Sequence, residues 1–143
     1  MVDITTAFIS TATAVLAGVL SYVLTKRAER EAEWRKEKLN RYKTFIGSLS
    51  GILENESSHQ EQKQFARACN DLLLFAPQSV IDALHRFQDE IGASNHEKSA
   101  ARHDALLSHL LLAIRRDLKI RPRDKADSFQ ARLWASSYRK TRR

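Results

Sequence analysis

The first third of the chain changes from apolar to charged with nothing between that would interrupt a helix. Residues 4–25 carry no charged side chain, and the charged residues begin at Lys26. The first proline is Pro77, and Gly18 is the only glycine in the uncharged stretch. About 20 residues at 1.5 Å each cross a hydrocarbon core of about 30 Å. The pattern therefore predicts a transmembrane helix over 4–25 that continues as a juxtamembrane, coiled-coil-like helix over 26–54.

The charges on either side of this stretch predict its orientation. Residues 1–3 include Asp3 and no basic side chain, unlike the positive start of a secretory signal peptide, whereas Lys26, Arg27 and Arg30 follow the stretch. Basic residues next to a membrane span favour the cytoplasmic side. We therefore expect a single-pass protein of a bacterial inner membrane, with residues 1–3 outside and the C-terminal domain in the cytoplasm. A buried core helix and a cleaved signal peptide are the alternatives.

The same helix carries a seam whose steps alternate between four and three residues. This is the spacing of a left-handed coiled coil. The first part of the seam is small or hydroxylated, as in membrane helices that pack through close contact and hydrogen bonds. Its last part is large and apolar, so we expect a homo-oligomer that packs along this seam. The residues expected to pack along the seam are Ala7, Thr11, Ala14, Gly18, Ser21, Thr25, Leu39, Tyr42, Ile46 and Leu49. Between and beyond them the same spacing passes through Ala28, Ala32, Arg35 and Leu53.

Residues 58–120 show the helical periodicity of a small bundle. Ser58 and Glu61 have the spacing of a capping box that opens a helix, and Pro77 closes it. Ser79 is the predicted cap of the next helix, and Gly92 is its predicted end. The predicted fold is all-α: the N-terminal transmembrane helix is continuous with a long cytosolic helix, and a small antiparallel helical bundle follows.

A last helix is predicted from Glu97 to Lys119, before Pro122. Its leucines cover more than one face, so the helix either sits centrally or turns a spare face to another subunit, and we favour the second. Antiparallel connections would bring the end of this helix back towards the start of the bundle, and therefore towards lipid headgroups.

The chain lacks the patterns that indicate catalysis or a resident cofactor. Its single cysteine, Cys69, forms no intrachain disulfide or multi-cysteine metal site, and it falls on a predicted apolar face. The histidines are scattered, and no glycine-rich phosphate loop or nucleophile motif is present. We therefore expect a protein that is not an enzyme and that needs neither a cofactor nor a metal.

Positive charge is concentrated at the C-terminal end. Residues 1–114 have a net charge of −1, whereas residues 115–143 have a net charge of +8. Arginine grips phosphate bidentately, and aromatic rings stack on bases or lie at a lipid interface. The predicted site for an anionic ligand comprises Arg115, Arg116, Lys119, Arg121 and Arg123, with Trp134 and Tyr138 as stacking or interface aromatics.

The basic tail, residues 121–143, is expected to contain a short amphipathic helix within 127–140. Its candidate partners are an anionic nucleotide, nucleic acid and anionic lipid. A solubilising tail without a ligand is the simpler alternative.

In the order of its parts, the chain resembles the small membrane effectors of bacterial antiviral nucleotide signalling. These include the cyclic-oligoadenylate-responsive membrane proteins that accompany type III CRISPR systems. The resemblance implies a non-enzymatic oligomer whose cytosolic domain binds a nucleotide messenger and whose transmembrane helices then perturb the membrane or open a pore. It assigns no residues. The alternative is a single-pass scaffold that docks a cytoplasmic protein partner.

Overall fold

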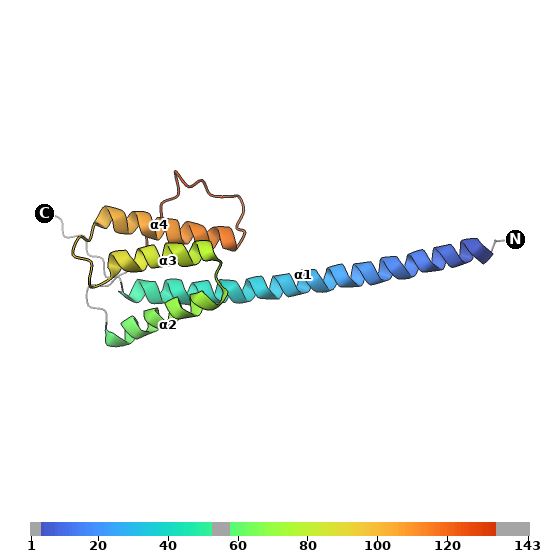
Figure 1. Ribbon diagram of the computed structural model, residues 1–143, viewed down its shortest axis with the longest axis horizontal. Helices are drawn as coiled ribbons and strands as arrows, with labels where there is room; N and C mark the ends of the chain where they lie inside the picture. Colours follow the sequence, from blue (N-terminus) through green and yellow to red (C-terminus); the bar gives the residue numbers. More distant parts are fainter. Residues whose placement is uncertain (1–3, 53–57, 134–143) are drawn as a thin grey trace. The chain divides into compact units, whose positions relative to one another are not determined.

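The computed structural model describes the backbone of residues 4–52 and 58–133, and the side chains of 13–52 and 58–133. Four helices follow one another in this part of the chain (Figure 1). They are α1 (Ile4–Ile52), α2 (His59–Phe75), α3 (Gln78–Ile91) and α4 (Ala100–Asp117). The described residues contain no strand, and the predicted all-α class is confirmed.

Two of the predicted helix ends are confirmed. The side chain of Ser58 accepts a hydrogen bond from the Glu61 amide, and the Ser58 amide donates to the Glu61 carboxylate at 2.6 Å. This reciprocal pair satisfies two amides that have no partner within the helix. α3 ends before Gly92, whose amide donates to the carbonyl of Gln88. At both positions the helix end is set by residues three or four positions apart in the sequence.

Two predicted helix starts are wrong. α3 is capped by Pro77 and not by Ser79, because the fixed φ of proline suits the position before a helix and Ser79 lies in the first turn. α4 begins at Ala100 rather than Glu97. The backbone before it is held in a loop instead, since the Ser99 amide donates to Glu90 Oε1 at 2.8 Å. The Ser99 side chain then caps the helix.

The chain divides into two compact units, Met1–Glu37 and Lys38–Arg143. In the first unit, the apolar side chains of residues 15–24 are exposed. Within the described part of the chain, no helix combines the length and apolar character that a membrane crossing requires. The side chains of 4–12, which include the predicted seam residues Ala7 and Thr11, lie outside the described residues.

The second unit is an antiparallel helical bundle to which α1 contributes its C-terminal part (Figure 1). The Tyr42 ring meets Phe75 of α2 edge-on at a centroid distance of 5.5 Å, and Phe45 packs against Phe65 of the same helix. These contacts close one hydrophobic core. Its largest fully buried side chains are Tyr42, Phe45, Phe87, Leu49, Leu72, Leu84, Leu110 and Val80.

This core corrects the cytosolic part of the predicted oligomer seam. Tyr42 and Leu49 are buried inside the chain's own bundle, so they are not available to a second copy. The fully buried position between them is Phe45, whereas Ile46 lies at the edge of the core. Both residues continue a helical stripe at allowed spacing, and the larger ring takes the inward position. Leu39 remains exposed.

Residues 118–133 of the chain itself cover part of the second apolar face of α4. Leu112 is only 3% exposed, and it lines a cavity together with Ala126, Phe129 and Ala131. We call residues 118–133 the strap. The strap contains no helix, so the predicted amphipathic helix is absent from residues 127–133, and residues 134–140 lie outside the described residues.

Candidate anion-binding site

The end of α4 brings the predicted basic residues into one tight turn. The Lys119 amide donates to the Arg116 carbonyl, and the Ile120 amide donates to the Arg115 carbonyl. This pair of bonds is a Schellman motif, which needs a left-handed residue after the helix cap. Lys119 takes that conformation with a φ of 54°. Glycine is the usual residue here because a side chain makes the conformation unfavourable.

A cavity of about 500 Å³ opens beside this turn. All five basic residues predicted for the anionic ligand line it, and the rest of its lining is Ile120 and Asp124. Arg116, Lys119, Arg121 and Arg123 are exposed, while Arg115 is half-buried. The lining thus carries five cationic groups and one carboxylate, which makes the cavity strongly attractive to anions.

Arg115 differs from the other four basic residues because its guanidinium is already engaged. Its Nε donates to Asp124 Oδ2 at 2.6 Å, and its Nη2 donates to Asp124 Oδ1 at 3.1 Å. These hydrogen bonds hold the pKa of the Asp124 carboxyl below its ordinary value and raise that of Arg115. The Arg115 guanidinium also lies 5.6 Å from the centre of the Phe129 ring. Arg115 therefore ties both Asp124 and Phe129 of the strap to α4.

Three side chains fix the end of α4 against the first helix. Both carboxylate oxygens of Asp117 accept from Lys38 Nζ at 2.9 Å, and Oδ2 also accepts from the Tyr42 hydroxyl at 2.7 Å. Burial and then this hydrogen bond raise the pKa of Tyr42 far above its ordinary value. The basic cavity therefore lies at the end of the bundle where the chain enters it at Lys38.

Sequence reasoning did not find this triad or the role of Asp124. The signal for Asp117 was weak, because an acidic residue in the last turn of a helix is unfavourable unless a cation offsets it. Asp124 gave no comparable signal, since its pairing depends on how the strap turns back after α4.

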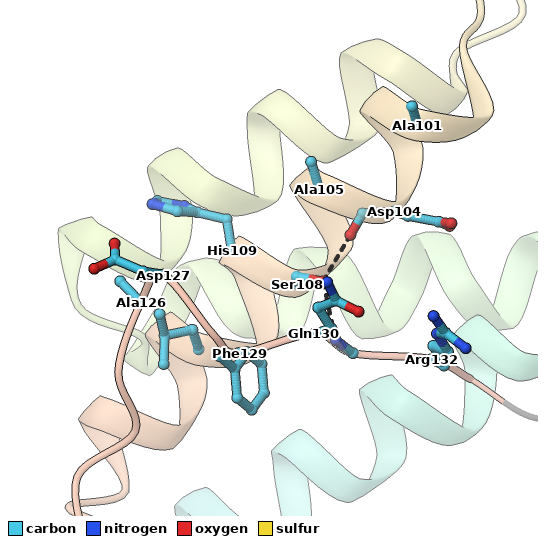
Figure 2. A pocket seen from close by; sticks show the side chains of 12 residues that line it. Ala101, Asp104, Ala105, Ser108, His109, Ala126, Asp127, Phe129, Gln130 and Arg132 are labelled. Carbon is cyan, nitrogen blue, oxygen red and sulfur yellow. Dashed lines mark hydrogen bonds between the residues drawn. The ribbon is translucent and has the colours of Figure 1, made fainter.

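A second cavity, of about 430 Å³, lies between α4 and the strap (Figure 2). The Ser108 hydroxyl donates to the Asp104 carbonyl at 2.7 Å and accepts from the Ala131 amide at 2.9 Å. It therefore holds the strap in place, with His109 and Asp127 at the rim (Figure 2). This hydroxyl has a structural task and is not arranged as a nucleophile.

The remaining candidate groups are structural or lie outside the described residues. Cys69 is buried, and burial raises the pKa of its thiol to about 11, as expected of a core cysteine. The described residues contain no group of three side chains placed to hold a metal ion. Trp134 and Tyr138, the predicted stacking aromatics, lie outside the described residues.

No protein-family model, curated protein or solved structure matches this chain.

Proposed function

We propose that this chain is a non-enzymatic, membrane-tethered protein whose helical bundle binds a phosphate-bearing ligand at the end of α4. The observation that carries the proposal is the convergence of five basic side chains on one cavity of about 500 Å³. Cavities of about 300–1,000 Å³ suit small ligands, and guanidinium groups suit phosphate oxygens. A nucleotide messenger, the end of a nucleic acid and an anionic lipid headgroup all present this chemistry.

The left-handed backbone conformation of Lys119 supports the interpretation of the cavity as a binding site. A left-handed lysine costs stability at a position where glycine would be accepted. Strained residues of this kind concentrate at functional sites. The lysine adds a cation to the cavity lining, which offers a reason for its presence.

The exposed apolar side chains of the first unit support membrane tethering. Val15, Leu16, Val19 and Leu20 share one side of α1, and all of them are exposed. An exposed apolar face of this kind is stable when lipid or other helices cover it. Together with the uncharged sequence over 4–25, this favours a single-pass anchor in a bacterial inner membrane with a cytoplasmic bundle.

Oligomerisation along Ala14, Gly18, Ser21 and Thr25 would then couple the bundle to the membrane. Ligand binding changes the packing of such helices only when the ligand binds one packing more tightly than the other. The expected outputs are a perturbed membrane or an open pore. The layout shared with membrane effectors of antiviral nucleotide signalling fits this mechanism.

A thermal-shift screen of the detergent-solubilised full chain tests the ligand. The probes are pyrophosphate, ATP, short single-stranded RNA and vesicles that contain anionic lipid. A ligand at about 100 times its Kd stabilises by about 2.7 kcal/mol, which raises Tm by several degrees. Arg116→Ala and Arg123→Ala should each weaken binding about tenfold or more, because each removes charge-assisted hydrogen bonds.

The matched control is Arg67→Ala, which removes an exposed arginine from α2 without touching the cavity. If Arg67→Ala also loses binding, the net charge of the protein and not a specific site accounts for the affinity. Extraction of cell membranes with carbonate tests the tether, since an integral protein stays in the pellet and a peripheral one is released.

A scaffold that docks a cytoplasmic protein is the second candidate. The observation that favours it is the exposure of Leu73 and Leu74 on α2, the latter at 85%. A scaffold predicts no stabilisation by any anion. It also predicts that Leu74→Ser abolishes co-purification of the partner while Arg116→Ala does not.

A further inference from the structure

The guanidinium of Arg115 already binds a carboxylate of the same chain, that of Asp124. Two oxygens of Asp124 face two nitrogens of one guanidinium, at 2.6 and 3.1 Å. A phosphate group binds arginine in the same two-point geometry. The Asp124 carboxylate therefore occupies a position that a ligand phosphate would take. This observation refines the proposed anion site and depends on it.

Displacing Asp124 is harder than filling an empty site. Asp124 lies nine residues from Arg115 in the same chain, so the two groups meet at a high effective concentration. The hydrogen bonds from Arg115 also lower the pKa of the Asp124 carboxyl, so they favour the ionised form that binds the guanidinium. An incoming monoanion brings no more charge than the group it must replace. An incoming dianion brings about twice the charge to the same cations.

We infer that Asp124 sets the ligand class of the cavity: it excludes phosphodiesters and admits a terminal phosphomonoester, which displaces it from Arg115. A phosphomonoester carries a charge of about −1.5 to −2 at pH 7 and has three strong acceptor oxygens. A phosphodiester carries one negative charge and has two such oxygens. Every phosphate of a cyclic oligoadenylate is a diester, so a nucleotide messenger that binds this cavity has a terminal phosphate instead. The other four basic residues surround the same cavity and attract the second charge of the monoester.

Displacement also changes how the strap is attached. Arg115 contacts Asp124 and the Phe129 ring at the same time, and the Ala131 amide reaches Ser108 further along. A phosphate that takes the fork leaves the strap attached to α4 through Phe129, Ala131 and the bond to Ser108. Asp124 is then free to turn to solvent, since it is only partly covered.

The phosphomonoester has two possible sources, a soluble molecule and a lipid headgroup. Glycerol 3-phosphate is the soluble monoester probe, and dimethyl phosphate is the matching diester. Phosphatidylcholine vesicles with phosphatidic acid present a monoester on a lipid, whereas vesicles with an equal mole fraction of phosphatidylglycerol present a diester. Binding of the full chain in detergent is measured by calorimetry for the soluble probes, and binding of the full chain in nanodiscs is measured by vesicle association for the lipids.

The decisive variant is Asp124→Asn, and its control is Asp127→Asn. Both remove one negative charge from the strap, but Asp127 lines the other cavity. The wild type and Asp127→Asn should prefer monoester to diester by about tenfold or more. In Asp124→Asn the diester should gain about tenfold and the preference should fall to about twofold, because the competitor is gone. Asp124→Glu restores the carboxylate and should restore the preference.

Each other outcome has a defined meaning. If the wild type binds monoester and diester equally, or if both Asn variants shift the ratio alike, the role of Asp124 is overturned and the anion site stands. If ATP or RNA binds but none of these four probes does, the role of Asp124 is overturned. The proposed function itself fails if pyrophosphate, ATP and RNA do not bind either. A preference seen with glycerol 3-phosphate alone identifies a soluble ligand, and one seen with phosphatidic acid vesicles alone identifies a lipid.

Discussion

The two units of the chain differ in how far their apolar side chains are exposed. In the first unit, Val19 is 57% exposed, and its apolar neighbours over residues 15–24 are exposed as well. In the second unit, Phe45 and Leu49 are completely buried. Both groups of residues belong to the same helix, α1 (Ile4–Ile52). The difference therefore lies in the partners available and not in the helix.

The contrast shows what each unit needs for stability. The second unit buries its apolar face against α2, α3, α4 and the strap, so it supplies its own core. The first unit has no such cover among the described residues, so its apolar side chains are exposed. Substitutions on one helix can therefore separate a folding effect from an assembly effect.

Removal of a core ring should give the largest effect. Phe45→Ala leaves a cavity at a fully buried position, so we expect a loss of about 3–5 kcal/mol in the free energy of unfolding. Urea denaturation followed by circular dichroism measures this loss. Val19→Ala on the same helix is the control and should change the free energy by less than about 0.5 kcal/mol. Similar losses for both variants would contradict the conclusion that only the second unit depends on a core within the chain.

The buried ion pair at the end of α4 should give the next largest effect. Asp117→Asn removes the charged acceptor that Lys38 and Tyr42 share in a partly buried position, and we expect a loss of about 2–3 kcal/mol in the free energy of unfolding. Asp71→Asn is the matched control. Its partner Arg41 lies 3.8 Å away on the surface, and that loss should stay below about 0.5 kcal/mol. The same urea titration measures both variants, and equal losses would contradict the anchoring role of Asp117.

Lys119 should show a smaller effect of opposite sign. Lys119→Gly relieves a left-handed side chain, so the free energy of unfolding should rise by about 0.5–1 kcal/mol while pyrophosphate binding weakens. Lys125→Gly removes the same charge from the strap where φ is negative, and it should lower stability slightly. A gain in stability without any loss of binding would remove Lys119 from the proposed site.

Gly18 should report on assembly with almost no effect on folding. A Cβ added at Gly18 meets nothing within 4 Å in the single chain, so Gly18→Leu should leave bundle unfolding unchanged. If neighbouring copies pack along the predicted seam, the added side chain separates them and crosslinked oligomer yield falls several-fold. Leu at Ala17 or at Val19 is the control for register. An equal fall for those variants would place the seam on another face.

Local signals in the sequence predicted much of the fold. The capping pair at Ser58 and Glu61 and the end of α3 at Gly92 depend on residues within one turn, and the burial of Cys69 agrees with its place on a periodic apolar face. The distinction between Phe45 and Ile46 at the core depends on the helices opposite, so periodicity alone did not decide it.

The residues of the candidate site could be predicted from the sequence, but their hydrogen-bond and ion-pair partners could not. The run of basic residues after Ile114 is visible in the sequence, and their meeting around one cavity follows from a single tight turn. The pairing of Arg115 with Asp124 and of Lys38 with Asp117 requires the path of the strap and the packing of α4 on α1. Those contacts join residues that no local pattern connects.

The third helix has a consequence for how the bundle opens. α3 has no side-chain hydrogen bond at its N-terminal cap, and it buries Val80, Ala83, Leu84 and Phe87 within 14 residues. A short helix whose cap makes no side-chain hydrogen bond has little independent stability, so α3 persists only while the bundle around it is intact. Its amide hydrogens should then exchange with solvent only through cooperative opening of the whole unit, which would make α3 the slowest-exchanging element.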